Sequence, residues 1–174
     1  MHYINVIRNS ETGTALSEKP VKWLRSIARK LYEWRWYRLS LWGYNLLVRL
    51  EPNNDNTWHD RGIIFSKFGQ YDKAVHDYRK ALEIFPAHDR AYYNIANTFA
   101  HRNKHQEAIE YFRNAIELNS KGLYWFGLAL SQKSLEADSD ALISIKKAIE
   151  LGSGDAEVDG KLFSTVMASW NSSN

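Results

Sequence analysis

The feature that most constrains this chain is a pattern that recurs every 33 or 34 residues. When three successive units are aligned, five positions hold residues of the same kind in every unit. These positions, or columns, are an aromatic residue, three small residues, and a bulky apolar residue between the last two small ones. The columns are Trp58, Tyr92 and Trp125; Gly62, Ala96 and Ala129; Ala74, Ala108 and Ala141; Tyr78, Phe112 and Ile145; Ala81, Ala115 and Ala148. A period of this length is typical of stacked helix pairs, because one pair cannot bury its apolar face alone. The pattern therefore predicts an all-α fold.

These columns resemble the tetratricopeptide repeat family, in which small residues let two antiparallel helices pack closely. The resemblance implies a right-handed superhelical solenoid of antiparallel helix pairs, with about four repeats and a C-terminal capping helix. We predict a solenoid over 21–154, with repeats at 55–88, 89–122 and 122–154. A degenerate repeat at 21–54 precedes them and carries Ala28, Ser40, Tyr44 and Pro52 one period upstream. Residues 1–20 are predicted to be a flexible tail, and residues 155–174 a capping helix with a short tail.

The composition limits the classes of protein to which this chain can belong. The 174 residues are 44% hydrophobic and include no cysteine, which excludes disulfides and cysteine–metal sites. No apolar run approaches the roughly 18 to 20 residues that cross a bilayer. The N-terminus lacks the basic start, apolar stretch and cleavage site of a secretory signal. We therefore expect a cytoplasmic protein, with a peripheral position at a membrane as the alternative.

No catalytic constellation is recognisable in the sequence. It has neither a phosphate-binding glycine loop nor a cysteine nucleophile. His101 and His105 are four residues apart, a spacing that suits a metal on one helix, but Asn103 and Lys104 are expected to form a turn that separates them. The acidic stretch 153–159 lacks the spacing of a calcium loop. We predict that the protein is not an enzyme and uses no cofactor and no metal.

The family resemblance also implies a binding surface, because a fixed set of first-helix positions lines the concave face. The residues that it places in a peptide-binding groove are Arg25, Arg29, His59, Lys67, Arg90, Tyr93, Asn97, His101, Phe126 and Leu130. Arginines can bind carboxylates, and Asn97 can hydrogen-bond a peptide backbone. Phe126 and Leu130 can hold an apolar side chain. We expect an adaptor, chaperone or assembly factor whose partner is a protein or peptide with acidic residues and an apolar anchor. The alternative is that these residues are solvated positions on a scaffold.

Some members of the family hold a C-terminal carboxylate in a clamp of lysine, asparagine and arginine side chains. The matching positions in this chain include Asp60, which would repel a carboxylate, and Asn94, which lacks the expected charge. We therefore do not expect that clamp.

The N-terminal third is rich in tryptophan and basic residues. Residues 22–50 hold four of the seven tryptophans, and residues 19–49 carry a net charge of +7. One interpretation is a degenerate repeat that buries its leucines and Tyr44 while its basic residues face water. A second is a peripheral scaffold whose helices 22–42 dock on an anionic membrane surface. A third is contact with an acidic protein or with nucleic acid; nucleic acid is disfavoured because no binding motif appears. Self-association stays open. The predicted surface patch consists of Trp23, Trp34, Arg35, Trp36 and Arg38.

Overall fold

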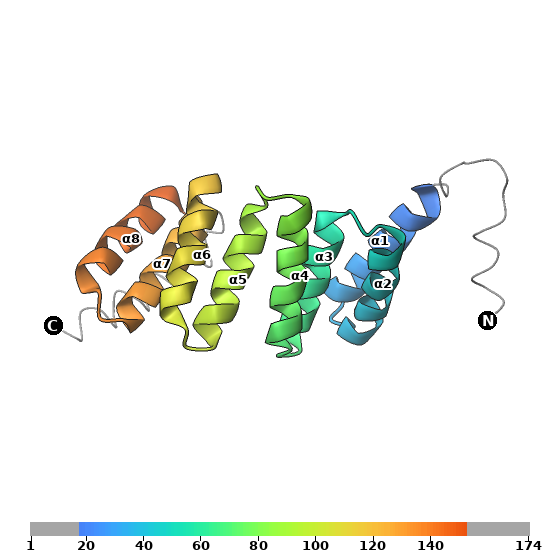
Figure 1. The fold of residues 1–174 in the computed structure, drawn as a ribbon, viewed down its shortest axis with the longest axis horizontal. Helices are drawn as coiled ribbons and strands as arrows, with labels where there is room; N and C mark the ends of the chain where they lie inside the picture. Colours follow the sequence, from blue (N-terminus) through green and yellow to red (C-terminus); the bar gives the residue numbers. More distant parts are fainter. Residues whose placement is uncertain (1–17, 153–174) are drawn as a thin grey trace.

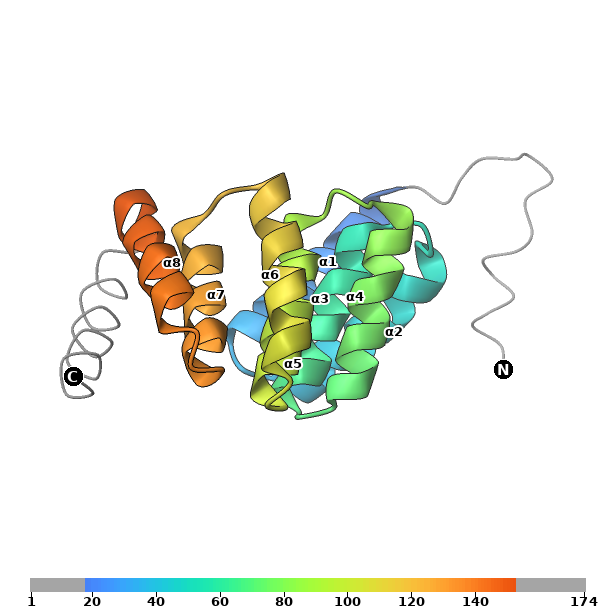
Figure 2. The same cartoon turned by 60° about the vertical axis from the view of Figure 1, so that its left-hand side comes forward.

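The computed structural model describes residues 18–152, which form eight α-helices and, within that range, no strand. The helices are α1 (Glu18–Glu33), α2 (Tyr37–Leu50), α3 (Asp55–Lys67), α4 (Tyr71–Ile84), α5 (Asp89–His101), α6 (His105–Leu118), α7 (Gly122–Ser134) and α8 (Asp138–Leu151). Consecutive helices pack in pairs, and the pairs form one row with α1 and α2 at one end and α7 and α8 at the other (Figures 1 and 2). The predicted all-α solenoid of helix pairs is confirmed.

The ends of the predicted organisation fall largely outside the described residues. The capping helix predicted within 155–174 and most of the tail predicted for 1–20 lie there. Helix α1 begins at Glu18, three residues before the predicted start of the first repeat. Helices α2 and α4 end two residues before Pro52 and Pro86, as expected because proline cannot continue a helix.

A tight turn at a fixed repeat position joins the two helices of every pair. The turn residue has a left-handed backbone in all four pairs: Arg35 (φ 64°), Gly69 (φ 69°), Asn103 (φ 57°) and Glu136 (φ 60°). In each turn the next residue donates its backbone N–H to the carbonyl oxygen five residues earlier, at N···O distances of 2.8–3.0 Å. Glycine enters this conformation freely and asparagine readily, whereas arginine and glutamate are strained there. Packing of the stack therefore imposes the turn at Arg35 and Glu136.

The small residues of the repeat form the contact line between paired helices. The alanines of the repeated columns, with Ala28 before them, are at most 7% exposed. Their size leaves room for Tyr78 and Phe112, which are fully buried beside them. A β-carbon added to Gly62 would lie only 2.6 Å from Cε1 of Tyr78, so this column is as close-packed as the pattern predicts.

The first helices of the second, third and fourth pairs each pack an apolar residue against the preceding pair. Ile64 of α3 packs in a cluster with residues of α1 and α2, and Ile95 of α5 packs against α4. Leu128 of α7 packs with residues of α5 and α6. The core is therefore continuous along the row, as a stack of mutually dependent repeats requires.

Candidate binding surfaces

The predicted groove residues of the third and fourth helix pairs converge on one pocket of about 390 Å³. Tyr93, Asn97 and His101 come from α5, where a spacing of four residues puts them on one face. Phe126 and Leu130 come from α7 by the same spacing. We call this pocket, with walls from α5 and α7 and further lining from α6, the α5–α7 groove. Leu130 is 45% exposed, so an apolar side chain is presented to an incoming partner.

Tyr93 forms the aromatic floor of the α5–α7 groove. Its ring stacks on Tyr124 at 4.8 Å between centroids and lies 5.9 Å from Phe112. Burial raises the pKa of Tyr93, while a hydrogen bond with Asn97 acts in the opposite direction. Tyr93 therefore orients Asn97, and the phenol stays neutral at physiological pH.

The two histidines at the end of the groove are placed as the turn predicts. His101 ends α5 and His105 begins α6, and both line the pocket. The ring of His101 stacks on Tyr71 with centroids 6.4 Å apart. Among residues 18–152 no group of three histidine, aspartate or glutamate side chains is arranged to hold a metal ion.

The end of the concave face near α1 combines the predicted arginines with acidic residues. Arg25 is paired with Glu51. Arg29 lines a separate pocket of about 250 Å³ whose other members are Tyr32, Glu33, Tyr44, Asp60 and Ile63. The hydroxyl of Tyr44 donates to Oδ2 of Asp60 at 3.0 Å, and burial followed by the charge of Asp60 raises the pKa of Tyr44. This end therefore carries both signs of charge.

His59 was predicted to line the groove, but its side chain lies beneath the surface and is 1% exposed. Its Nε2 is 2.9 Å from Nδ2 of Asn94 on α5, and its Nδ1 is 3.2 Å from Oδ1 of Asp60. Its ring packs against that of His88, with centroids 4.7 Å apart and the ring planes tilted by 32°. His59 therefore joins α3 to α5, because its polar partners are Asn94 of the next pair and Asp60 of its own helix rather than solvent. The hydrogen bond with His59 also involves the side-chain amide of Asn94, one of the residues at the positions of the carboxylate clamp that we do not expect here.

The two remaining predicted groove residues lie at the surface. Nη2 of Arg90 donates to Oδ1 of Asn56 at 3.2 Å, which links the first turns of α5 and α3. Lys67 is exposed at the end of α3 and lines neither of the two pockets above.

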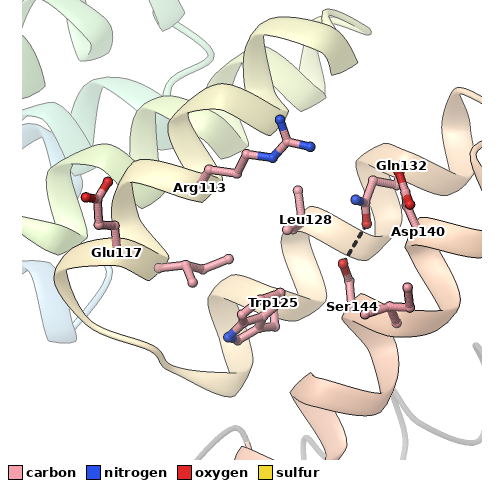
Figure 3. A pocket seen from close by; sticks show the side chains of 9 residues that line it. Arg113, Glu117, Trp125, Leu128, Gln132, Asp140 and Ser144 are labelled. Carbon is pink, nitrogen blue, oxygen red and sulfur yellow. Dashed lines mark hydrogen bonds between the residues drawn. The ribbon is translucent and has the colours of Figure 1, made fainter.

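A third pocket, of about 350 Å³, was not predicted from the sequence (Figure 3). Arg113 and Glu117 of α6 border it on one side and Asp140 of α8 on the other, with Trp125 of α7 between them. On its α8 side the hydroxyl of Ser144 donates to Oε1 of Gln132 at 2.7 Å. In the preceding pair the same two positions hold Phe99 and Tyr111, whose stacked rings are 5.4 Å apart. Two polar side chains that are smaller than the rings they replace leave space here, and Gln132 was the available sequence signal.

The tryptophans of the first helix pair lie outside its core. Their exposed fractions are 67% for Trp23, 63% for Trp34, 58% for Trp36 and 68% for Trp42. Arg35 and Arg38 are exposed beside them. Tyr44 and Leu47 are buried, so an ordinary core forms between α1 and α2 without these tryptophans. Among the helices of residues 18–152, none has the length and apolar character needed to cross a membrane.

Comparison with protein families places residues 59–122 in the tetratricopeptide repeat. The small glutamine-rich tetratricopeptide repeat-containing protein 2 of Mycosarcoma maydis is 28% identical over 106 residues, which are 60% of this chain and 30% of that protein. The protein of the same name from Saccharomyces cerevisiae is 22% identical over 151 residues, 87% of this chain and 42% of that protein. The chain thus spans less than half of the length of these relatives.

Solved structures of MamA share the fold. MamA 41-end from Desulfovibrio magneticus RS-1 superposes with a TM-score of 0.69 over 75% of each chain, at 20% identity. A crystal structure of MamA has a TM-score of 0.71 over 85% of this chain and 83% of that one, at 15% identity. At this level of identity the likeness concerns the arrangement of helices alone.

Proposed function

We propose that this chain, whose residues 59–122 match the tetratricopeptide repeat, is a non-enzymatic interaction protein that holds a segment of a partner protein in the α5–α7 groove. Stacks of this kind generally work by offering an extended surface. The observation that carries the proposal is the convergence of Tyr93, Asn97, Phe126 and Leu130 on one pocket that is open to solvent. In this role the protein acts as an adaptor, chaperone or assembly factor.

The two walls of the groove suit different parts of a peptide. Phe126 and Leu130 on α7 provide an apolar wall for an anchor side chain. Asn97 on the facing wall carries both a donor and an acceptor, which match a peptide backbone. Ligand pockets occupy about 300–1,000 Å³, and this one lies near the lower limit, so it takes one or two anchor side chains while the rest of the segment lies along the concave face.

The charges along the concave face set the expected partner chemistry. Arg25 and Arg29 have acidic neighbours, so an acidic stretch gains less near α1 than the sequence suggests. Arg90 is exposed and its guanidinium donates to Asn56, while a guanidinium carries five N–H donors and so can bind further acceptors. A carboxylate of the partner therefore binds best at Arg90, next to the pocket that takes the apolar anchor.

The test is capture of partners from a native lysate, followed by titration calorimetry with the captured partner. The variant is Asn97→Ala/Leu130→Gln, which changes groove side chains that are not fully buried. The matched control is Asn114→Ala/Leu142→Gln, because Asn114 is exposed and Leu142 is 41% exposed outside the groove. Loss of an anchor contact costs about 2 kcal/mol or more, so we expect affinity to fall about 30-fold or more in the groove variant only. Equal affinity of the two variants would refute groove binding.

A further inference from the structure

The first helix pair leaves uncovered a face that the other pairs bury. Ile64 of α3, Thr98 of α5 and Ser131 of α7 share one repeat position and are at most 2% exposed. The same position in α1 is Lys30, which is exposed. The pattern repeats two helical turns earlier, where Thr57, Ala91 and Tyr124 are at most 2% exposed and Trp23 is 67% exposed. Within residues 18–152 no preceding pair covers these positions of α1.

Helix α2 carries an apolar stripe where its counterparts are polar. Leu39, Trp42 and Leu46 are three and four residues apart, so they share one helix face, and their exposed fractions are 53%, 68% and 37%. The corresponding residues are Lys73, His76 and Lys80 in α4, Glu107, Glu110 and Asn114 in α6, and Asp140, Ile143 and Lys147 in α8. Only Ile143 among these nine is apolar. Among the second helices of the four pairs, only α2 is apolar at all three of these positions, and an exposed apolar stripe of this kind indicates contact with another body.

Basic residues are exposed on the same helix pair as these apolar side chains. The exposed cations of α1, α2 and the turn between them include Lys19, Arg29, Lys30, Arg35, Arg38 and Arg49. Tryptophan and leucine between arginines and lysines match the surface of a bilayer, where the apolar side chains enter the boundary between head groups and acyl chains and the cations meet lipid phosphates. Another helix pair fits less well, because it would bury Lys30 at a position that elsewhere holds isoleucine, threonine or serine.

We propose that the first helix pair docks on an anionic lipid surface. The docking surface, called the first-repeat face, consists of Trp23, Trp34, Trp36, Leu39, Trp42 and Leu46 with the cations around them. Trp34 and Trp36 flank Arg35 in the turn that joins α1 and α2, and their ring centroids are 6.2 Å apart. Attachment is peripheral. The proposal is independent of the groove, which lies on other helix pairs and stays accessible when the first pair is docked.

Flotation of the full chain with lipid vesicles tests the proposal. Two kinds of vesicle are compared: phosphatidylcholine alone, and phosphatidylcholine mixed with phosphatidylserine. We expect binding to the mixed vesicles only, and weaker binding as salt is raised, because salt screens the charges. A basic residue near an anionic surface contributes about fivefold in binding, so Arg38→Glu/Arg49→Glu should lower the partition coefficient about 30-fold or more. Trp23→Ser/Trp42→Ser should lower it by at least about tenfold.

Matched variants on other helices separate this face from general effects of charge and hydrophobicity. Ile143→Ser changes the residue of α8 that corresponds to Trp42 and is 65% exposed. Lys73→Glu/Lys146→Glu makes the same change in net charge elsewhere, and both lysines are exposed. These variants should bind vesicles like the unmodified chain. Equal loss in the control variants, or equal binding to neutral vesicles, would overturn the proposal. Absence of vesicle binding would also overturn the proposal. One such case is a dimer, seen by sedimentation, that dissociates in the Trp23→Ser/Trp42→Ser variant, since the face would then bind a second copy of the chain.

Discussion

Arg61 of α3 and Asp77 of α4 form a two-pronged ion pair inside the second helix pair. Nε of Arg61 lies 2.7 Å from Oδ2 of Asp77, and Nη2 lies 2.8 Å from Oδ1. The Asp77 side chain is 1% exposed, and the guanidinium also lies over the rings of Trp58 and Phe65, 4.8 and 5.5 Å from their centroids. Removing the arginine alone would leave a carboxylate buried without its partner. Such a change costs about 3–5 kcal/mol.

The third helix pair shows how the same space is filled without charge. Ile95, Phe99 and Tyr111 occupy the repeat positions of Arg61, Phe65 and Asp77. The double variant Arg61→Ile/Asp77→Tyr therefore copies a set of side chains that already packs in this stack. Replacement of a buried ion pair by well-packed apolar residues is often neutral or stabilising. We expect the double variant to lie within about 1 kcal/mol of the unmodified chain, and Arg61→Ile alone to lose about 3–5 kcal/mol.

Urea unfolding followed by far-ultraviolet circular dichroism measures these free energies. The unmodified chain, the two single variants and the double variant make a complete double-mutant cycle. The reasoning is refuted if Arg61→Ile costs less than about 1 kcal/mol, the range of an exposed pair. It is also refuted if the double variant loses as much as the two single variants together, since the pair would then stabilise the fold through something other than mutual charge compensation.

Two further changes test the packing of the stack. Burial, followed by the charge of His59, lowers the pKa of His88. The imidazole therefore binds a proton more tightly in the unfolded chain than in the folded one. The free energy of unfolding falls as pH decreases below about 6.5, by at most about 1.4 kcal/mol per pH unit. His88→Asn, which copies the capping residue Asn54 one period earlier, should flatten this profile in urea titrations at several pH values; an unchanged slope would exclude His88 as its source. Gly62→Ala gains about 1 kcal/mol of helix propensity but forces a β-carbon against the buried ring of Tyr78, which costs about 1–3 kcal/mol. We expect a lower melting temperature, and an unchanged or higher one would contradict the close approach.

The backbone of the stack could be predicted from the sequence because its requirements recur. Small residues at fixed offsets indicate where helices approach, and the structure places Ala74 and Ala81 fully buried at those contacts. The register also locates turns that local preference would not suggest. Arg35 and Glu136 adopt the left-handed conformation that glycine takes at Gly69, because the helices on both sides fix the turn between them.

The side-chain partners could be predicted only in part, because they depend on neighbouring repeats. The register brings Tyr93, Asn97 and Phe126 to one pocket. The register also assigns His59 to the surface, but its side chain is buried and forms a hydrogen bond with the amide of Asn94 in the next pair. The pairing of Arg25 with Glu51 involves the segment between two helix pairs, for which the repeat sets no pattern. A periodic sequence thus predicts positions more reliably than hydrogen bonds and charges.

Departures from the repeat locate surfaces that the repeat itself does not explain. Gln132 breaks an aromatic column, and a pocket lies beside it. Trp42 occupies a position that is polar in α4 and α6, and its ring is exposed. Neither departure improves the packing of its own helix pair, since Trp42 lies outside the core and Gln132 leaves space unfilled. A side chain that contributes little to folding yet exposes apolar surface carries a cost in solubility. That cost is offset when another molecule covers the surface, as the proposed docking of the first-repeat face on lipid would do.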